Sequence, residues 1–363
     1  MKKKIAWITP DYFYCADACI VPNLSHDFDI HWFLINTKDA KRKTVPASHD
    51  SIRQYPVDLK YRQRDPRILL QYLSILWKIR KMNPDLVYLS FHGLPFFFPL
   101  FFLLIDKKKV IYAAHNVSTP KGASNEKFMR VYQDYAFKRI SRFHVFSKYQ
   151  LQVIREMLPG KQHYYAPFVL EEYGASSVQP TARPIRFLFF GYIRKYKRLD
   201  LLLDAFQQLV DMGYNDIELL VAGNCENWDE YQSLIRHHDH IKCRVEVIPN
   251  NDIPDLVSSC HYMVLPYQDG AQSAVLTLAY QYNKPVIVSE INSFKQFVKE
   301  NETGYYFTSE SVDSLRDVLK YSIDHFDSDY TRLTSNIPSL VEQEFALDSI
   351  TEKYKSFLEQ SVA

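Results

Sequence analysis

The sequence predicts an α/β protein with two domains, each built around a doubly wound parallel sheet. Its composition is that of a globular protein, since 47% of the 363 residues are hydrophobic and 24% are charged. The chain is longer than the ~250–300 residues that a single hydrophobic core usually supports. Short continuous apolar runs alternate with amphipathic runs, as expected for buried parallel strands and the helices that cover them.

The first half of the chain shows this alternation from its start. Continuous apolar runs predict strands, and apolar residues at intervals of three and four predict helices. Strands are expected at residues 4–9, 29–36, 86–91, 110–114 and 142–146, and helices at 66–82 and 126–140. This order indicates a parallel sheet with helices on both faces.

A polar stretch at residues 176–184, rich in Ser, Pro and Thr, is the best candidate for a linker, and the alternation restarts after it. We expect strands at 185–190, 217–222, 245–248, 261–265 and 285–289, a helix at 199–212, and mainly helix after Phe307. The predicted domains are therefore 1–175 and 185–345. A final helix at 346–363 either stays with the second domain or crosses back to the first. Ligands of such folds bind at the carboxyl ends of the strands, here in the cleft between the domains.

The two halves carry opposite charge. Residues 1–165 hold 27 Lys and Arg against 13 Asp and Glu, whereas the remaining residues hold 17 against 29. A basic half favours an anionic partner, such as the inner leaflet of a membrane or a pyrophosphate group, over a merely solvated basic face. The apolar segment 94–105, followed by Lys107 to Lys109, is either a membrane-docking segment or a buried helix, and the buried helix is favoured.

The compartment is expected to be the cytoplasm, with peripheral attachment to the inner membrane face as an option. No signal peptide is recognised, and segment 94–105 is too short to span a bilayer. The five cysteines are irregularly spaced, so neither a disulfide framework nor a zinc site is expected. Two Asp-x-Asp pairs, at 27–29 and 327–329, are interpreted as surface acids, and no metal site is expected.

Two segments carry residues suited to phosphate chemistry. In the first, a hydrophobic strand ends at Gly191, and a basic loop with Arg194 and Lys197 follows. Glycine permits a tight turn, while the guanidinium and ammonium groups would offset the charge of a diphosphate. In the second, a small polar turn from Asp269 leads to a helix start near Ser273, where free backbone N–H groups favour an anion. Taken alone, Ser273 is equally an ordinary helix N-cap.

These segments, in their order and spacing, resemble the GT-B glycosyltransferases of family 4. The similarity covers residues 185–307 and is closest to a bacterial branch in which Gln-Ser-Gly-Val-Leu replaces the usual acidic pattern. It rests on Phe-Phe-Gly-x-Ile-Arg-x-Tyr-Lys, Leu-Val-Ala-Gly, Leu-Pro-Tyr, Gln-Ser-Ala-Val-Leu, Asn-Lys-Pro-Val-Ile and Thr-Gly, which end in turn at residues 197, 223, 267, 276, 287 and 304. The first half agrees with the family mainly in its fold pattern.

The resemblance implies a nucleotide diphosphate sugar as the donor, a retaining reaction, and no metal or other cofactor. Arg194 and Lys197 match the basic pair that stabilises the leaving diphosphate. The remaining expected donor contacts are Gly191, Gly223, Asn224, Ile248, Pro249, Asp269, Gln272, Ser273, Ala274 and Val275.

His115 follows the strand at 110–114 and resembles the family's histidine beside the transferred sugar, so it is a candidate catalytic residue. Without the family context, a lone histidine at a strand end is more often structural. His92 is a weaker candidate on the acceptor side. Ser147 resembles a serine at the family's domain edge, but a helix N-cap explains it equally well.

Three departures from the family pattern stand out. The two family glutamates, eight residues apart, fall on Gly270 and Leu278, so the ribose contact lacks its usual carboxylate; Asp269 is a possible substitute for the first. The Gly-Gly loop after the first strand is missing. The later Gly-Gly is replaced by Asn292-Ser293.

The predicted function is a retaining glycosyltransferase that moves a sugar to a glycan or lipid-linked saccharide in bacterial surface polysaccharide synthesis, whether capsule, O-antigen or exopolysaccharide. Two alternatives stay open at this stage. The missing glutamates and glycines suggest a catalytically lapsed partner subunit, and a GT-B nucleotide-sugar epimerase would need no acceptor. Arg194, Lys197, Gln272 and Ser273 speak for the transferase, because they are suited to stabilising a leaving group.

Overall fold

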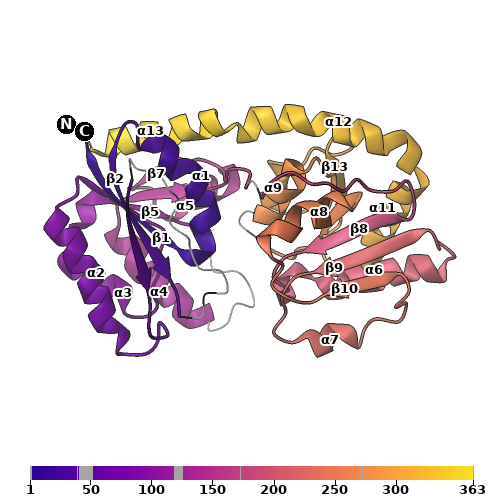
Figure 1. The fold of residues 1–363 in the computed structure, drawn as a ribbon, viewed down its shortest axis with the longest axis horizontal. Coiled ribbons are helices and arrows are strands. Elements are labelled where there is room, and N and C mark those ends of the chain that lie inside the picture. Colours follow the sequence, from indigo (N-terminus) through magenta and orange to yellow (C-terminus); the bar gives the residue numbers. More distant parts are fainter. Residues whose placement is uncertain are drawn as a thin grey trace. The chain divides into compact units, whose positions relative to one another are not determined.

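The structure is a computed structural model that describes residues 2–38, 40, 52–117, 126–171, 173–270 and 273–362. The chain divides into two compact units, each with one parallel sheet and helices on both faces (Figure 1). The first unit contains the residues up to Val169 together with Ala346–Ala363, and the second contains Leu170–Phe345. The predicted α/β class with two doubly wound sheets is confirmed.

The sheet of the first unit has seven parallel strands in the order β3-β2-β1-β4-β5-β6-β7. The order reverses between β1 and β4, which is the point where such a sheet forms its ligand crevice. The strand bounds are β1 Lys4–Pro10, β2 Asp29–Asn36, β3 Arg53–Asp58, β4 Leu86–Leu89, β5 Val110–Ala113, β6 Arg142–Val145 and β7 Gln162–Tyr165.

Two hydrophobic clusters cover the two faces of this sheet. Helices α2, α3, α4 and α5 pack on one face, and helices α1 and α13 pack on the other. The helix bounds are α1 Tyr14–Leu24, α2 Ile68–Met82, α3 Phe97–Leu104, α4 Glu126–Arg139, α5 Lys148–Met157 and α13 Leu347–Val362, with short 3-10 turns η1 Asp11–Phe13 and η2 Lys107–Lys109. The last helix of the chain therefore completes the core of the first unit.

The sheet of the second unit has six parallel strands in the order β10-β9-β8-β11-β12-β13. The strand bounds are β8 Ile185–Phe190, β9 Ile217–Ala222, β10 Ile241–Arg244, β11 Tyr262–Leu265, β12 Val286–Ser289 and β13 Gly304–Phe307. The helices are α6 Leu199–Asp211, α7 Trp228–Gln232, α8 Ile253–Ser258, α9 Ala274–Gln281, α10 Asn292–Lys295, α11 Val312–Asp324 and α12 Phe326–Phe345, with turns η3 Lys195–Lys197 and η4 Asn250–Asp252.

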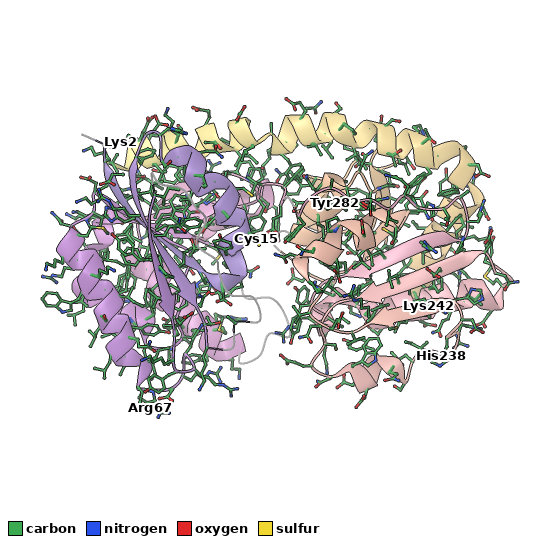
Figure 2. All side chains as sticks on the ribbon, in the orientation of Figure 1. Lys2, Cys15, Arg67, His238, Lys242 and Tyr282 are labelled. Carbon is green, nitrogen blue, oxygen red and sulfur yellow. The ribbon has the colours of Figure 1, made fainter. Side chains whose placement is uncertain are left out.

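The predicted linker is tied to the second unit by hydrogen bonds. The Asp255 carboxylate in α8 accepts from the Ser176 hydroxyl at 2.7 Å and from the Ser177 backbone N–H at 3.0 Å. Tyr282, labelled in Figure 2, follows α9, and its hydroxyl donates to the Gly174 carbonyl at 2.9 Å. These hydrogen bonds therefore hold the start of the segment against the second unit.

One predicted strand is wrong. The alternating residues 245–248 suggested a strand, but β10 lies four residues earlier, where Ile241 to Arg244 pair with β9. Val247 is exposed, so its apolar side chain does not mark a buried strand face. The Arg244 guanidinium binds Glu246 and Asp252, and these ion pairs hold the chain after the strand end.

The segment 94–105 forms α3 and is a packed helix, as the favoured interpretation expected. Phe97, Phe98 and Phe101 are buried in the core of the first unit, whereas Leu103 is 73% exposed. Within the described ranges, no helix is both long and apolar enough to cross a membrane.

Candidate functional site

Two glycines bring the carboxyl ends of β8 and β9 together. Gly191 follows β8 with a φ of +99°, and Gly223 follows β9 with a φ of +145°, values that L side chains rarely adopt. A Cβ on Gly223 would lie 2.0 Å from the Gly191 carbonyl oxygen, so no side chain fits there. The Gly191 N–H donates to the Ala222 carbonyl at 2.9 Å, and the Ile193 N–H donates to the Asn224 carbonyl at 2.9 Å. The predicted glycines thus form one close-packed turn.

Lys197 places a buried cation beside this turn. Its side chain lies in η3 and is only 7% exposed. Its Nζ lies 3.2 Å from the position of a Cβ on Gly191 and 5.2 Å from the ring centre of Tyr267. No acidic side chain among the described residues pairs with it. Burial, together with the nearby Arg194 cation, lowers the pKa of the Lys197 ammonium to about 8. The lysine therefore stays protonated at neutral pH without a counter-ion.

Arg194 begins the same turn but is held toward the β9 side. Its guanidinium lies 4.2 Å from the ring centre of Tyr192 and 3.6 Å from a carboxylate oxygen of Glu226. Glu226 also accepts a hydrogen bond from the Tyr192 hydroxyl at 2.6 Å. The Arg194 side chain is about half exposed, so this ion pair is weak and easily exchanged for another anion.

The start of α9 adjoins Gly191. Val275 Cγ2 lies 3.3 Å from the position of a Cβ on Gly191. Ser273 is buried and caps the helix, since its hydroxyl accepts from the Leu276 N–H at 3.4 Å. Ala274, at the first helical position, is exposed. The first-turn N–H groups and the helix dipole thus lie beside the glycine turn and Lys197, an arrangement that favours an anion. Gln272 lies outside the described residues.

The other predicted donor contacts are placed differently. Asp269 accepts a hydrogen bond from the adjacent Gly270 N–H at 2.8 Å. Ile248 is buried in the core of the second unit, so its side chain is not accessible to a ligand. Pro249 is exposed and directly precedes η4. Leu278, at the place of the family's second glutamate, is 4% exposed and packs in the same core. Leu278 therefore cannot supply the carboxylate contact that the family resemblance implies at this position.

The structure adds a residue that the sequence did not single out. The Ser293 hydroxyl is buried and has no hydrogen-bond partner among the described residues. It lies 4.0 Å from the position of a Cβ on Gly270. A buried polar group without a partner is costly, so this hydroxyl is suited to a ligand. The sequence feature that could have identified Ser293 is the replacement of the family's Gly-Gly by Asn292-Ser293.

In the first unit, His115 lies just beyond β5 in a stack of aromatic rings. Its ring centre is 3.3 Å from that of Phe13 and 4.6 Å from that of Phe146. Both ring nitrogens are buried and have no hydrogen-bond partner among the described residues. Burial lowers the pKa of His115 well below its ordinary value of 6.5, so the imidazole is neutral. It can donate or accept a hydrogen bond but carries no proton to give as an acid.

The two weaker candidates of the first unit have structural partners. His92 pairs with the Tyr112 hydroxyl, and burial lowers its pKa to about 4. The Ser147 hydroxyl accepts from the Gln150 N–H at 3.2 Å, which makes it the N-cap of α5.

The two parallel sheets, one of seven strands and one of six, form the GT-B fold. Sucrose-phosphate synthase from Thermosynechococcus elongatus has a similar fold, with a TM-score of 0.78 at 14% identity over 99% of both chains. Anabaena HepE, solved with UDP and glucose, gives a TM-score of 0.72 at 13% identity over 99% of this chain and 100% of that one.

Residues 176–336 match the model of the family Glycosyl transferases group 1. A GDP-mannose:glycolipid 4-beta-D-mannosyltransferase from Xanthomonas campestris pv. campestris is 28% identical over 140 residues, which are 38% of this chain. The match spans 39% of the length of that relative.

Proposed function

We propose that the protein transfers a sugar from a nucleotide diphosphate sugar to a glycan or lipid-linked saccharide, with retention of anomeric configuration. The observation that carries the proposal is Lys197, a buried ammonium without a counter-ion between a glycine turn and the start of a helix. Burying a charge is costly unless it is paired, so the site is built for an anion. The diphosphate of the donor supplies that anion.

Each group has a role in this reaction. When the bond between the sugar and the diphosphate breaks, negative charge grows on the leaving phosphate oxygen. The Lys197 ammonium and the α9 N–H groups would stabilise this charge, and their preorganisation gives them their effect. Arg194 would exchange Glu226 for a phosphate oxygen. The neutral His115 would hold a sugar hydroxyl by a hydrogen bond.

A comparison of two neighbouring lysines tests the assignment. Lys197→Ala should lower kcat for transfer by about 10³-fold, because removing one such donor typically costs 10²–10³-fold and this donor is charged. Lys195→Ala is the matched control, since Lys195 lies in the same turn but is 83% exposed on its side chain. A Lys197→Ala enzyme with wild-type turnover would refute the assignment.

Thermal unfolding in the presence of a panel of UDP- and GDP-sugars would identify the donor, because a ligand that binds the folded state raises the melting temperature. UDP is bound by Anabaena HepE, and a GDP sugar is named for the Xanthomonas relative, so both bases belong in the panel. A chain that melts unchanged with every nucleotide sugar would contradict the proposal.

The setting that we propose is the synthesis of a bacterial surface polysaccharide in the cytoplasm, at the inner face of the membrane. The glycolipid acceptor in the name of the Xanthomonas relative supports a lipid-linked acceptor. The basic first half of the chain supports contact with an anionic leaflet.

A second candidate is a lapsed subunit that binds nucleotide without turnover. It is favoured by Gly270 and Leu278, which stand where the family carries glutamates, and by the burial of Leu278 in the core. A nucleotide-dependent rise in melting temperature without transfer to any lipid-linked saccharide would select this candidate.

A further inference from the structure

One helical layer of the first unit exposes large apolar side chains to solvent. Helices α2, α3 and α4 pack on the same face of the seven-stranded sheet. On their outer side, Leu70 and Trp77 of α2 and Leu103 of α3 are 75%, 61% and 73% exposed. Phe128 and Val131 of α4 are exposed as well. The outer side of α2, α3 and α4 is called the docking face below.

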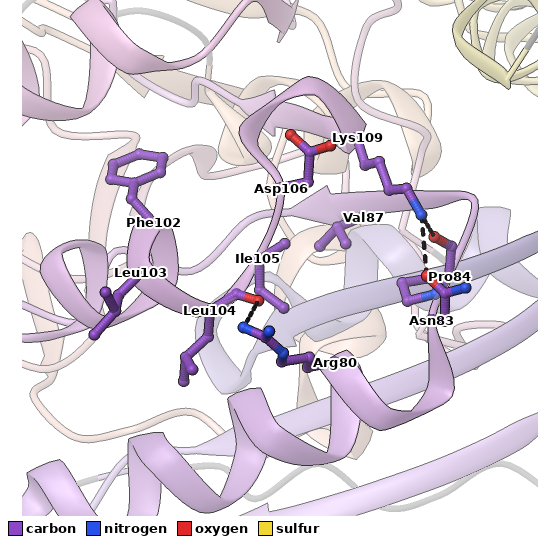
Figure 3. Close-up of a pocket in the computed structure, with 10 residues that line it drawn as sticks. All are labelled: Arg80, Asn83, Pro84, Val87, Phe102, Leu103, Leu104, Ile105, Asp106 and Lys109. Atoms are coloured by element: carbon purple, nitrogen blue, oxygen red, sulfur yellow. Dashed lines mark hydrogen bonds between the residues drawn. The ribbon is translucent and has the colours of Figure 1, made fainter.

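These side chains lie on helices that share one hydrophobic core. Leu70 and Trp77 are seven residues apart, or nearly two helical turns, and therefore lie on the same side of α2. Helices α2 and α3 lie side by side (Figure 1). Their inner sides meet at the Tyr72 and Phe97 rings, and their ends are joined by a 3.4 Å hydrogen bond from Arg80 to the Leu104 carbonyl (Figure 3).

The same surface is positively charged. Helices α2 and α3 contain no acidic residue, and α2 carries Lys78, Arg80 and Lys81 in its last two turns. Three further lysines, 107 to 109, form η2 directly after α3. Arg67, just before α2, extends outward from the first unit (Figure 2), but its guanidinium is paired with the Asp65 carboxylate at 2.7 Å. Apolar side chains set among cations are typical of a surface that lies at a membrane interface.

A pocket of about 390 Å³ opens where the ends of α2 and α3 meet (Figure 3). Its walls combine the apolar Phe102, Leu103 and Leu104 with the cationic Arg80 and Lys109. The Lys109 ammonium donates to the Pro84 carbonyl at 2.8 Å and to the Asn83 side-chain oxygen at 3.2 Å. The partners of Lys109 and Arg80 in these hydrogen bonds are neutral, and the Asp106 side chain also lines the pocket.

We propose that the docking face binds the surface of an anionic lipid bilayer. Leu70, Trp77 and Leu103 enter the boundary between headgroups and acyl chains, while Lys81, Lys107 and Lys108 meet the phosphates. Charge complementarity favours this occupant, since protein interfaces are depleted in lysine, whereas a surface with more basic than acidic residues suits anionic lipid. The docking extends the proposed function, because it would bring the protein to a lipid-linked acceptor, but it does not require transfer to occur.

Vesicle sedimentation tests the proposal with the whole chain. The wild-type protein should bind vesicles of phosphatidylcholine and phosphatidylglycerol far more tightly than vesicles of phosphatidylcholine alone. Each cation at an anionic surface contributes roughly fivefold in affinity, so Lys81→Gln/Lys107→Gln/Lys108→Gln should bind roughly 100-fold more weakly. Trp77→Ser/Leu103→Ser should weaken binding by roughly 10- to 100-fold, by loss of apolar burial.

Met212→Ser/Leu234→Ser is the matched control, since both residues are exposed apolar side chains of the second unit. It should bind vesicles like the wild type. All variants should keep the same rise in melting temperature with the nucleotide sugar that the wild type binds. A variant that no longer binds vesicles but still shows this rise in melting temperature would show that membrane docking and donor binding are separate.

Fluorescence gives a second, local measurement. Trp77 is exposed, whereas Trp7 and Trp32 are fully buried. Brominated lipids should quench the emission of the wild type, and Trp77→Phe should remove most of the quenching while vesicle binding is retained.

Two outcomes would overturn the proposal. One is equal binding of the lysine triple variant and the wild type to anionic vesicles. The other is a wild type that does not bind vesicles but forms a dimer that Trp77→Ser/Leu103→Ser converts to a monomer, because a second copy would then occupy the docking face.

Discussion

The carboxyl ends of β8 and β5 bury a basic group in two different ways. After β8, a glycine turn surrounds Lys197, and burial with the charge of Arg194 lowers its pKa from 10.5 to about 8. After β5, the rings of Phe13 and Phe146 enclose His115 and lower its pKa from 6.5. The same desolvation therefore leaves a cation in the second unit and a neutral imidazole in the first, because the starting pKa values differ by four. Under the proposed function, Lys197 after β8 would bind the diphosphate anion, and His115 after β5 would bind a sugar hydroxyl.

The largest effect is expected where the two strand ends of the second unit touch. Gly223→Ala would place a Cβ 2.0 Å from the Gly191 carbonyl, so the turn must open. We expect a loss of about 3 kcal/mol or more in the free energy of unfolding, measured by urea denaturation. Gly213→Ala is the control, because its φ of +96° is also unfavourable but its Cβ would meet no atom within 4 Å. It should cost about 1 kcal/mol. Equal losses for both variants would contradict the close contact.

At the other strand end, His115→Phe keeps an aromatic ring in the stack and removes both ring nitrogens. We expect kcat for transfer to fall by about 100-fold, as for the loss of a positioned catalytic group, with little change in melting temperature. The nucleotide alone should bind as before. A His115→Phe enzyme that transfers sugar at the wild-type rate would reduce His115 to a packing residue.

The comparison also predicts a pH dependence for the second unit alone. Under the proposed function the ammonium form of Lys197 binds the diphosphate, and its pKa is about 8, so above that pH binding must take up a proton. Affinity for the donor should therefore be constant below pH 8 and fall by up to tenfold per pH unit above it, as measured by calorimetry. Lys197→Arg keeps its charge throughout and should flatten this profile; a decline that persists unchanged in that variant would assign the titration elsewhere.

The smallest effect is expected at Ser293. Its hydroxyl is buried without a partner, so Ser293→Ala should leave the free energy of unfolding unchanged or slightly higher. If the hydroxyl binds the donor, KM should rise by roughly 3- to 10-fold with little change in kcat. Initial rates at varied donor concentration check this, and Ser328→Ala, at an exposed serine of α12, is the control. Equal KM values in both variants would remove Ser293 from the donor site.

The sequence predicted the elements in which composition and periodicity agree. Buried strands such as β8 and β9 have the predicted bounds, because both faces of these strands are covered and their residues are mostly apolar. The edge strands β3 and β7 were missed, since Arg53-Gln54-Tyr55 and Gln162-His163-Tyr164 are polar and partly exposed. β10, also at an edge, was placed four residues too late. Edge strands keep one side free, so their sequences carry a weaker signal.

The candidate site could be predicted only in part. Glycines and basic residues at strand ends are visible in the chain, and Gly191, Gly223, Lys197 and Val275 do lie together in the second unit. What the sequence does not contain is the direction of each side chain. It could not show that Arg194 is paired with Glu226, or that the Ser293 hydroxyl is buried against Gly270 without a partner.

The position of α13 has a consequence for synthesis on the ribosome. Tyr354 and Phe357 of this helix pack on His144, within the same cluster that holds Trp7 and Tyr88 of the first strands. The core of the first unit therefore lacks one of its covering helices until α13 has been translated, whereas the second unit ends at Phe345 and can close earlier. The half that is made first thus depends on a helix that is made after the second unit.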